Sequence, residues 1–111
     1  MVKLTGYKKV KTAVFISGTG SNLKSLIKFS KIKNSPISIN LIITNNPDAQ
    51  GLKLGEINKI RKRVFNFKKK LKIENQILSY LKKHEIKLIC LAGFMKILSK
   101  NFILKFKGKI L

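Results

Sequence analysis

The residues best suited to chemistry form a glycine turn near the start of the chain, Ser17-Gly18-Thr19-Gly20-Ser21-Asn22. A β-branched and aromatic run precedes this turn, and a helical pattern follows it. At such a junction the first amides of the helix have no intrahelical acceptor, and the helix dipole adds partial positive charge. Ser21 and Asn22 can add side-chain donors. The turn therefore favours phosphate binding over a purely structural turn in which Ser21 caps the helix.

Two familiar phosphate motifs do not fit this turn. The dinucleotide fingerprint requires a third glycine at the position that Leu23 occupies. A P-loop requires a lysine after its last glycine, and Ser21 stands there instead. These departures argue against an NAD-dependent enzyme and against a P-loop ATPase.

A second candidate segment is the apolar run from Phe94 to Leu98, which contains a single charged residue, Lys96. It follows a predicted buried strand and the pair Ala92-Gly93. An apolar pocket with few polar groups suits a flat heterocyclic ligand. An apolar run after a buried strand also suits a hydrophobic core. The residues alone leave both interpretations open.

The remaining reactive side chains are few. Cys90 is the only cysteine, which excludes an intramolecular disulfide and a metal–thiolate cluster, and we predict no metal site. His84 is the only histidine and stands near the expected end of a helix among charged neighbours. We interpret it as a solvated residue favoured by the helix dipole rather than as a catalytic group.

Strand and helix patterns alternate along the chain. We expect strands over residues 12–17, 37–43, 64–67 and 86–91, and helices over residues 21–31, 51–59, 72–83 and 99–106. The expected inner faces of the first three helices are Leu23, Leu26 and Ile27, then Leu54 and Ile57, then Ile73, Ile77, Leu78 and Leu81. Ser99 is a possible N-cap of the last helix, and Gly108 lies just past its end.

This alternation predicts an α/β fold with a doubly wound parallel sheet, covered by helices on both faces. Lys109-Ile110-Leu111 resembles the first residues of a fifth strand, so we expect the domain to be truncated at the start of that strand. We expect a basic N-terminal extension over residues 1–11 and one incomplete domain over residues 12–111. An incomplete sheet leads us to expect marginal stability or a tendency to aggregate.

The charge balance is unusual, with 25 Lys and Arg residues against four Asp and Glu residues and a net charge of +21. A basic nucleic-acid-binding module is therefore an alternative. However, the lysines are spread through every predicted element, and only Arg61 and Arg63 are arginines. This pattern favours lysines that result from an AT-rich coding sequence and lie on solvated faces of the protein, rather than a selected polyanion site. No apolar run is long enough for a signal peptide core or a membrane span, which predicts a cytoplasmic protein.

Three segments together resemble the phosphoribosylglycinamide formyltransferases. Residues 16–23 are similar to the phosphate-binding turn of that family, and residues 91–99 are similar to its folate segment. Residues 43–52 resemble its second strand and the loop that follows. The three segments occur in the family's order, so the resemblance extends over residues 12–111.

The resemblance implies transfer of a formyl group from 10-formyltetrahydrofolate to the amino group of glycinamide ribonucleotide in de novo purine biosynthesis. Carried over to this chain, the ribonucleotide phosphate would be bound by Gly20, Ser21 and Asn22. The pteridine of the folate would be bound by Met95, Lys96, Ile97 and Leu98, with a contribution from Lys70 before the third helix.

The family's catalytic Asn and His lie in an Asn-Ile-His-Pro segment, with an Asp further on, after the strand that Lys109 would begin. The 111 residues contain no such segment, so we expect no catalytic residue and no transferase activity in this chain alone. A formyltetrahydrofolate hydrolase is the nearest alternative. Hydrolases usually carry a regulatory domain ahead of the catalytic one, and their first turn resembles Gly18-Thr19-Gly20-Ser21-Asn22 less closely, as does that of methionyl-tRNA formyltransferase.

Overall fold

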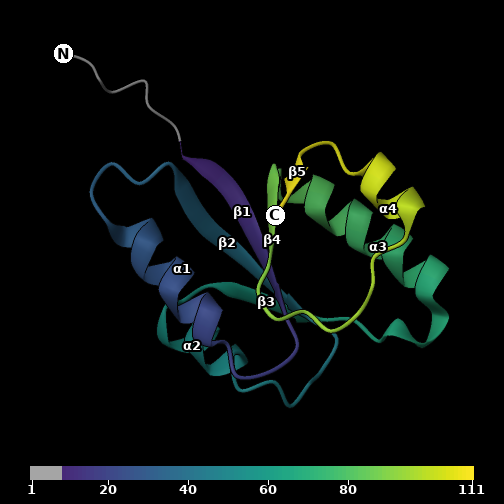
Figure 1. The fold of residues 1–111 in the computed structure, drawn as a ribbon, viewed down its shortest axis with the longest axis horizontal. Coiled ribbons are helices and arrows are strands. Elements are labelled where there is room, and N and C mark those ends of the chain that lie inside the picture. The colour runs from purple at the N-terminus through teal and green to yellow at the C-terminus, as the bar shows by residue number, and fades with distance from the viewer. Residues whose placement is uncertain (1–8) are drawn as a thin grey trace.

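The computed structural model describes residues 9–111 and shows a five-stranded parallel sheet between two pairs of helices (Figure 1). The sheet order is β3-β2-β1-β4-β5. The strands are β1 (Val10–Ile16), β2 (Ile37–Thr44), β3 (Arg61–Val64), β4 (Leu88–Leu91) and β5 (Lys109–Ile110). The helices are α1 (Ser21–Lys31), α2 (Leu52–Ile57), the 3-10 helix η1 (Phe67–Lys69), α3 (Lys70–Lys83) and α4 (Lys100–Lys105). The predicted doubly wound α/β fold is confirmed.

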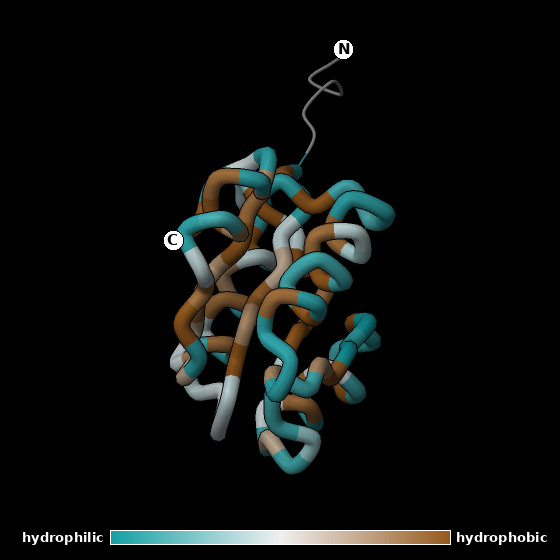
Figure 2. The backbone as a smooth tube through the Cα atoms, turned by 90° about the vertical axis from the view of Figure 1, so that its right-hand side faces the viewer, coloured by the Kyte–Doolittle hydropathy of each residue, from teal (hydrophilic) through white to brown (hydrophobic). Residues whose placement is uncertain are grey.

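The central strand β1 is buried on both faces. Ala13 and Phe15 pack with α3 and α4, whereas Val14 and Ile16 pack with α1 and α2, and all four side chains are completely buried. Because successive side chains of a strand point to opposite faces, β1 supplies both layers of the core. Figure 2 shows hydrophobic residues along the strands and hydrophilic residues on the outer turns of the helices.

The helices that sequence patterning predicts most clearly are present. In α1, Leu23 and Ile27 are buried and Leu26 is half-buried, as expected from the spacing of the apolar residues. In α3, Ile77 and Leu81 are buried against the sheet. The N-cap of α4 is also confirmed: the Ser99 hydroxyl accepts a hydrogen bond from the Phe102 amide at 3.1 Å.

Two short elements differ from the sequence-based expectation. The third strand covers Arg61–Val64 rather than residues 64–67, because an exposed edge strand needs no hydrophobic pattern. In α2, Ile57 is 75% exposed, so its predicted place on the inner face is wrong. Gly55 is the buried residue on the inner face of α2. The helix lies so close to the sheet there that a Cβ on Gly55 would be only 3.0 Å from Ile42 Cδ1.

The first strand begins earlier than the sequence pattern predicts. Residues 1–8 of the predicted extension lie outside the described residues. Val10 and Lys11 already belong to β1 and pair with Ile37 and Ser38 of β2. β1 therefore begins two residues before the strand expected from residue 12, and the division into an extension and a domain stays a prediction.

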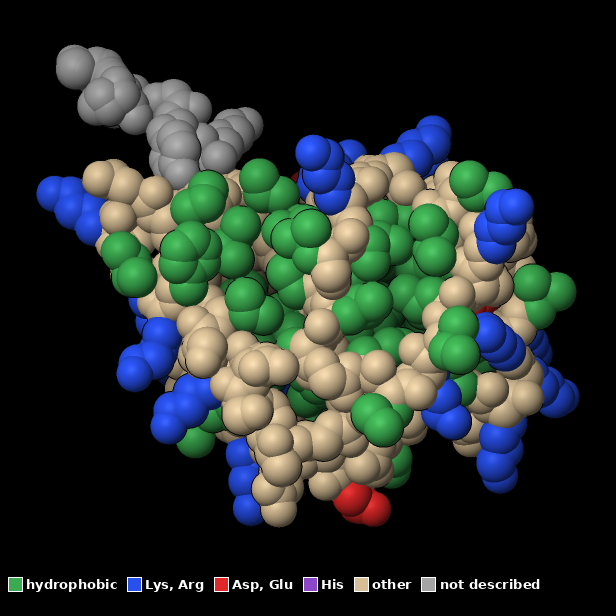
Figure 3. All heavy atoms as spheres, viewed as in Figure 1, with side chains coloured by type: hydrophobic (Ala, Val, Ile, Leu, Met, Phe, Trp, Pro, Cys, Tyr) green, Lys and Arg blue, Asp and Glu red, His purple; other side chains and the backbone are tan. Residues whose placement is uncertain are grey.

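Lysine and arginine side chains lie around the rim of the face that shows β5, and hydrophobic side chains gather in its middle (Figure 3). Leu111 at this face is 73% exposed, although its amide and carbonyl pair with β4. The outer edge of β5 and this apolar surface are features that favour association with other chains. The marginal stability expected from the sequence remains a prediction.

A buried carboxylate joins the two helices on one face of the sheet. Glu74 of α3 is only 2% exposed, and its carboxylate accepts hydrogen bonds from the Ser99 amide at 2.7 Å and from the Ser99 hydroxyl. Because the same hydroxyl caps α4, Glu74 fixes both the start of α4 and the end of the segment after β4. Hydrogen bonds to a charged acceptor are stronger than those between neutral groups.

We therefore expect Ser99→Ala to lower the free energy of unfolding by about 1–2 kcal/mol, through loss of the cap. Glu74→Ala is expected to cost about 2–4 kcal/mol, because it leaves the partly buried Ser99 amide without its acceptor and opens a void at the buried Glu74 position. Urea unfolding followed by circular dichroism measures both. Asn75→Ala, at the neighbouring exposed position of α3, is the control; a Glu74→Ala variant as stable as this control would contradict the assignment.

Candidate functional site

A cavity of about 250 Å³ lies where the strand order reverses, at the carboxyl ends of β1 and β4. Its walls are the glycine turn after β1, residues 17–22, and three residues after β4, namely Ala92, Gly93 and Met95. Open α/β sheets bind ligands at this topological switch point, because the connections from neighbouring strands diverge to opposite faces there. The two segments singled out from the sequence therefore meet in one site.

Close backbone packing holds the glycine turn. Gly20 has a φ of 80°, and a Cβ at this position would lie 2.7 Å from Gly51 Cα. A Cβ on Gly51 would lie 2.5 Å from Ile16 Cδ1. The Gly51 amide donates a hydrogen bond to the Gly18 carbonyl at 3.1 Å. The turn is thus pressed against the start of α2, and both glycines are required by conformation or by space.

The amino end of α1 is left open toward this cavity. Its N-cap is Gly20, which has no side chain to cap the helix, so the alternative in which Ser21 caps α1 is wrong. Ser21 and Asn22 are exposed, and the first turn of α1 carries no acidic residue. The first amides of α1 therefore remain available to an anion, and the helix dipole adds positive potential at the same point.

Ser17, in the wall of the cavity, connects the segments that follow three strands. Its hydroxyl donates to Asn45 Oδ1 at 2.5 Å and accepts from the Met95 amide at 2.8 Å. Its carbonyl accepts from Asn46 Nδ2 at 3.2 Å. The sequence placed Asn45 and Asn46 only within residues 43–52, the expected second strand and the loop that follows it. Their place directly after β2, level with Ser17 after β1, is the signal that would have indicated this contact.

The segment after β4 is anchored at two positions, by the side chains of Phe94 and Leu98. The ring of Phe94 packs edge-on against Phe15 at 5.3 Å and against Phe67 at 5.5 Å, measured between ring centroids. Leu98 is buried in the core beside Phe102. Between these anchors Met95 is 78% exposed. The anchors hold the segment rigidly on the sheet, so the residues between them are presented outward.

The residues predicted to bind folate therefore fall into two groups. Met95, Lys96 and Ile97 are exposed on one segment, and Met95 also lines the cavity. Leu98 lies in the core instead. Lys70 is exposed at the start of α3 and directly follows η1, whose Phe67 contacts Phe94. Lys70 thus lies at the same end of the sheet as the cavity.

None of the residues that line the cavity is ionisable. Burial raises the pKa of the Cys90 thiol on β4, which keeps it protonated. His84 follows α3 and precedes β4, so it lies at the opposite end of the sheet. Within residues 9–111 no group of three or more His, Cys, Asp or Glu residues could hold a metal ion. No helix in this range is long and apolar enough to cross a membrane.

The fold and the cavity define a doubly wound α/β protein with a cavity at its switch point, beside the uncapped amino end of α1. Residues 10–111 match the formyl transferase family. The chain therefore belongs to the formyl transferase family. It is 41% identical over 107 residues to the human trifunctional purine biosynthetic protein adenosine-3, covering 94% of this chain and 11% of that protein.

Shorter relatives match as well. The phosphoribosylglycinamide formyltransferase of Haemophilus influenzae is 40% identical over 104 residues, covering 91% of this chain and 49% of that protein. The crystal structure of the enzyme of that name from Brucella melitensis superposes with a TM-score of 0.88 at 35% identity, covering 93% of this chain and 55% of that one. The chain thus spans about half the length of these bacterial relatives.

The charges around His84, at the end of the sheet opposite the cavity, can be tested by titration of its imidazole. The pKa of this histidine lies below its ordinary value, first through burial and then through the positive charges of Arg61, Lys83 and Lys11. We expect an NMR titration of the imidazole to give a midpoint below 6.5. Arg61→Gln should move the midpoint upward, because removal of a cation makes protonation easier. Lys24→Gln on α1 is the control, and a midpoint at or above 6.5 in the unmodified chain would contradict the described surroundings.

Proposed function

We propose that residues 10–111 form the substrate-binding part of a phosphoribosylglycinamide formyltransferase, which transfers a formyl group from 10-formyltetrahydrofolate to glycinamide ribonucleotide in purine biosynthesis. The observation that carries this proposal is the cavity itself. It joins the open amino end of α1 to the exposed apolar segment after β4. A phosphate site and a surface for a flat heterocycle are thereby brought side by side, as a reaction between the two substrates requires.

The phosphate of the ribonucleotide would bind at the glycine turn. Gly20 allows the main chain to bend toward the ligand, and Gly18 faces open space, where a Cβ would meet no atom within 4 Å. Amides at the start of α1 would donate to the phosphate oxygens, with the side chains of Ser21 and Asn22 adding further donors. The absence of an acidic side chain in the first turn of α1 means that no carboxylate opposes the phosphate there.

The folate would bind along the segment after β4. Met95 and Ile97 offer apolar contact area that is already out of the core, so the pteridine can cover it without rearrangement of the sheet. Lys96 on this segment and Lys70 at the start of α3 would add positive charge for the carboxylates of the folate tail. Leu98 would act from beneath, by keeping the segment in place.

Formyl transfer to an amine also needs a group that manages protons and a donor for the oxyanion of the tetrahedral intermediate. The walls of the cavity contain no ionisable side chain. The four acids of the sequence are Asp48, Glu56, Glu74 and Glu85, and none of them lines the cavity. We therefore propose that these groups come from a segment not contained in the 111 residues, since the bacterial relatives are about twice as long.

The phosphate site can be tested by calorimetric titration of the 111-residue chain with glycinamide ribonucleotide at moderate salt. We expect saturable binding, and we expect Ser21→Ala and Asn22→Ala each to raise the dissociation constant about three- to tenfold, as loss of one hydrogen bond predicts. Ser25→Ala, one turn further along the exposed face of α1, should leave it unchanged. A chain that is folded by circular dichroism but shows no saturable binding would sink the proposed site.

The division between binding and chemistry leads to a second expectation. Residues 1–111, mixed with 10-formyltetrahydrofolate and glycinamide ribonucleotide, should show no formyl transfer above the uncatalysed rate, because the cavity lacks an acid–base group. The assay follows loss of the formyl group by absorbance, with a full-length bacterial relative as the positive control. Turnover by the purified 111-residue chain would contradict this division.

A further inference from the structure

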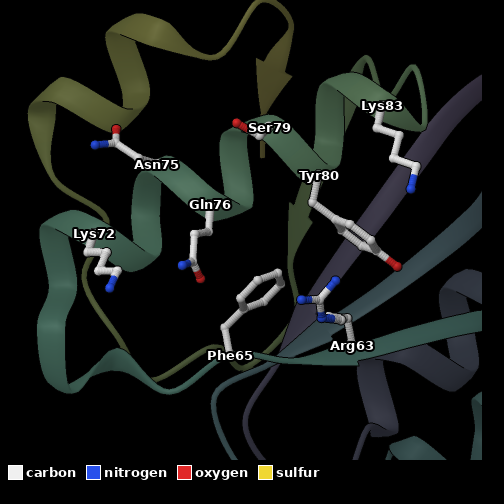
Figure 4. Close-up of a pocket in the computed structure, with 8 residues that line it drawn as sticks. All are labelled: Arg63, Phe65, Lys72, Asn75, Gln76, Ser79, Tyr80 and Lys83. Carbon is white, nitrogen blue, oxygen red and sulfur yellow. The ribbon is translucent and has the colours of Figure 1, made fainter.

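A second hollow of about 630 Å³ lies on the α3 side of the sheet, at the edge strand β3 (Figure 4). Arg63 and Phe65 line it from β3 and the residue that follows, and Tyr80, Gln76, Lys72 and Lys83 line it from α3. Figure 4 shows Tyr80, Gln76 and Lys72 extending from α3 toward Arg63 and Phe65. We call this hollow the Arg63 groove. It shares no residue with the cavity at the glycine turn.

The guanidinium of Arg63 packs over two neighbouring aromatic rings. Its Cζ lies 4.9 Å from the ring centroid of Phe65 and 4.9 Å from that of Tyr80. The two rings also contact each other edge-on, at 5.9 Å between centroids. Contact with the ring faces restrains the planar group but uses none of its N–H donors. Arg63 is therefore oriented in advance of any ligand.

The donors of Arg63 have no anionic partner in the described part of the chain. The two ion pairs among residues 9–111 are Lys11–Glu85 and Lys62–Glu56, so neither involves the groove. Lys72 and Lys83 add two further cations to its walls, and no carboxylate lines it. An oriented guanidinium with unused donors, in a groove that two lysines also line, is an arrangement suited to a multiply charged anion.

Two further observations separate this groove from the general lysine excess. All but two of the 25 basic residues are lysines, and both arginines, Arg61 and Arg63, lie on β3. Burial lowers the pKa of His84 first, and the positive charges of Arg61, Lys83 and Lys11 lower it further, so Lys83 belongs to a cluster of cations at this end of α3. Arginine binds phosphate through two parallel N–H bonds, which a lysine ammonium cannot do.

We propose that the Arg63 groove is a second anion site, which binds the phosphate groups of a small phosphorylated molecule. Arg63 contacts one phosphate through its free N–H groups, Lys72 and Lys83 balance the remaining charge, and Gln76 offers a further donor. The proposal favours a small ligand over single-stranded nucleic acid, because the faces of Phe65 and Tyr80 that meet Arg63 cannot also stack on bases. The proposal does not depend on the function assigned to the glycine turn.

The test uses inorganic pyrophosphate and adenosine diphosphate as probes of the 111-residue chain, followed by the NMR signals of the arginine Nε–H groups. We expect both probes to shift the Arg63 signal in a saturable way. Arg63→Lys, which keeps the positive charge but removes the planar guanidinium and its paired N–H donors, should raise the dissociation constant about tenfold. Arg61→Lys, the same change two residues away on β3 and outside the groove walls, should change it less than about twofold.

The outcomes separate the sources of binding. Equal affinity for both probes means that the phosphates alone are recognised, and tighter binding of the diphosphate nucleotide means that the groove also contacts its nucleoside; both support the site. An Asn22→Ala variant with unchanged Arg63 shifts confirms that the glycine turn is not responsible. Equal losses in Arg63→Lys and Arg61→Lys, no shift at Arg63, or tighter binding of a single-stranded oligonucleotide with contacts outside the groove would overturn the proposal.

Discussion

Burial of β1 on both faces is the constraint on which the rest of the structure depends. Burial of Val14, Phe15 and Ile16 contributes about 1.5–3 kcal/mol each, and the buried side chains alternate between the two helical layers, so β1 must occupy the middle of the sheet. The chain adds β2 and then β3 on one side of β1, and β4 and then β5 on its other side. This arrangement creates the switch point, and it places Ser17 where it can bond to Asn45 and to the Met95 amide. The cavity follows from the packing of one strand.

The elements that sequence patterning predicted are those whose burial dictates their residue types. β1, β2, α1 and α3 must present apolar side chains at fixed spacing, so their positions could be read from the sequence. β3 was misplaced because Arg61, Lys62 and Arg63 are exposed at a sheet edge, where burial imposes no pattern. The inward face of α2 was predicted wrongly because it includes Gly55, which lets the helix backbone approach Ile42 of the sheet closely. A search for apolar side chains does not detect a glycine in this role.

The candidate site was predictable to the extent that it is made of backbone. A glycine turn between a strand and a helix indicates an open helix end, and the amide donors there do not depend on side-chain packing. The contacts made by side chains were not predictable. Glu74 reads as one more charged position on a helix, yet it is buried against Ser99, and only the approach of α4 explains this. The stacking of Arg63 likewise depends on the distance between β3 and α3.

The net charge of +21 and the two hollows act at different ranges. Exposed lysines raise the local concentration of any anion, but solvent and salt screen them beyond about 10 Å, and they do not discriminate among ligands. Discrimination requires donors whose direction is set before binding. At the glycine turn the backbone of α1 sets it, and in the Arg63 groove the rings of Phe65 and Tyr80 set it. A chain this basic therefore attracts anions everywhere but has the geometry to select them only where its cations or amides are held.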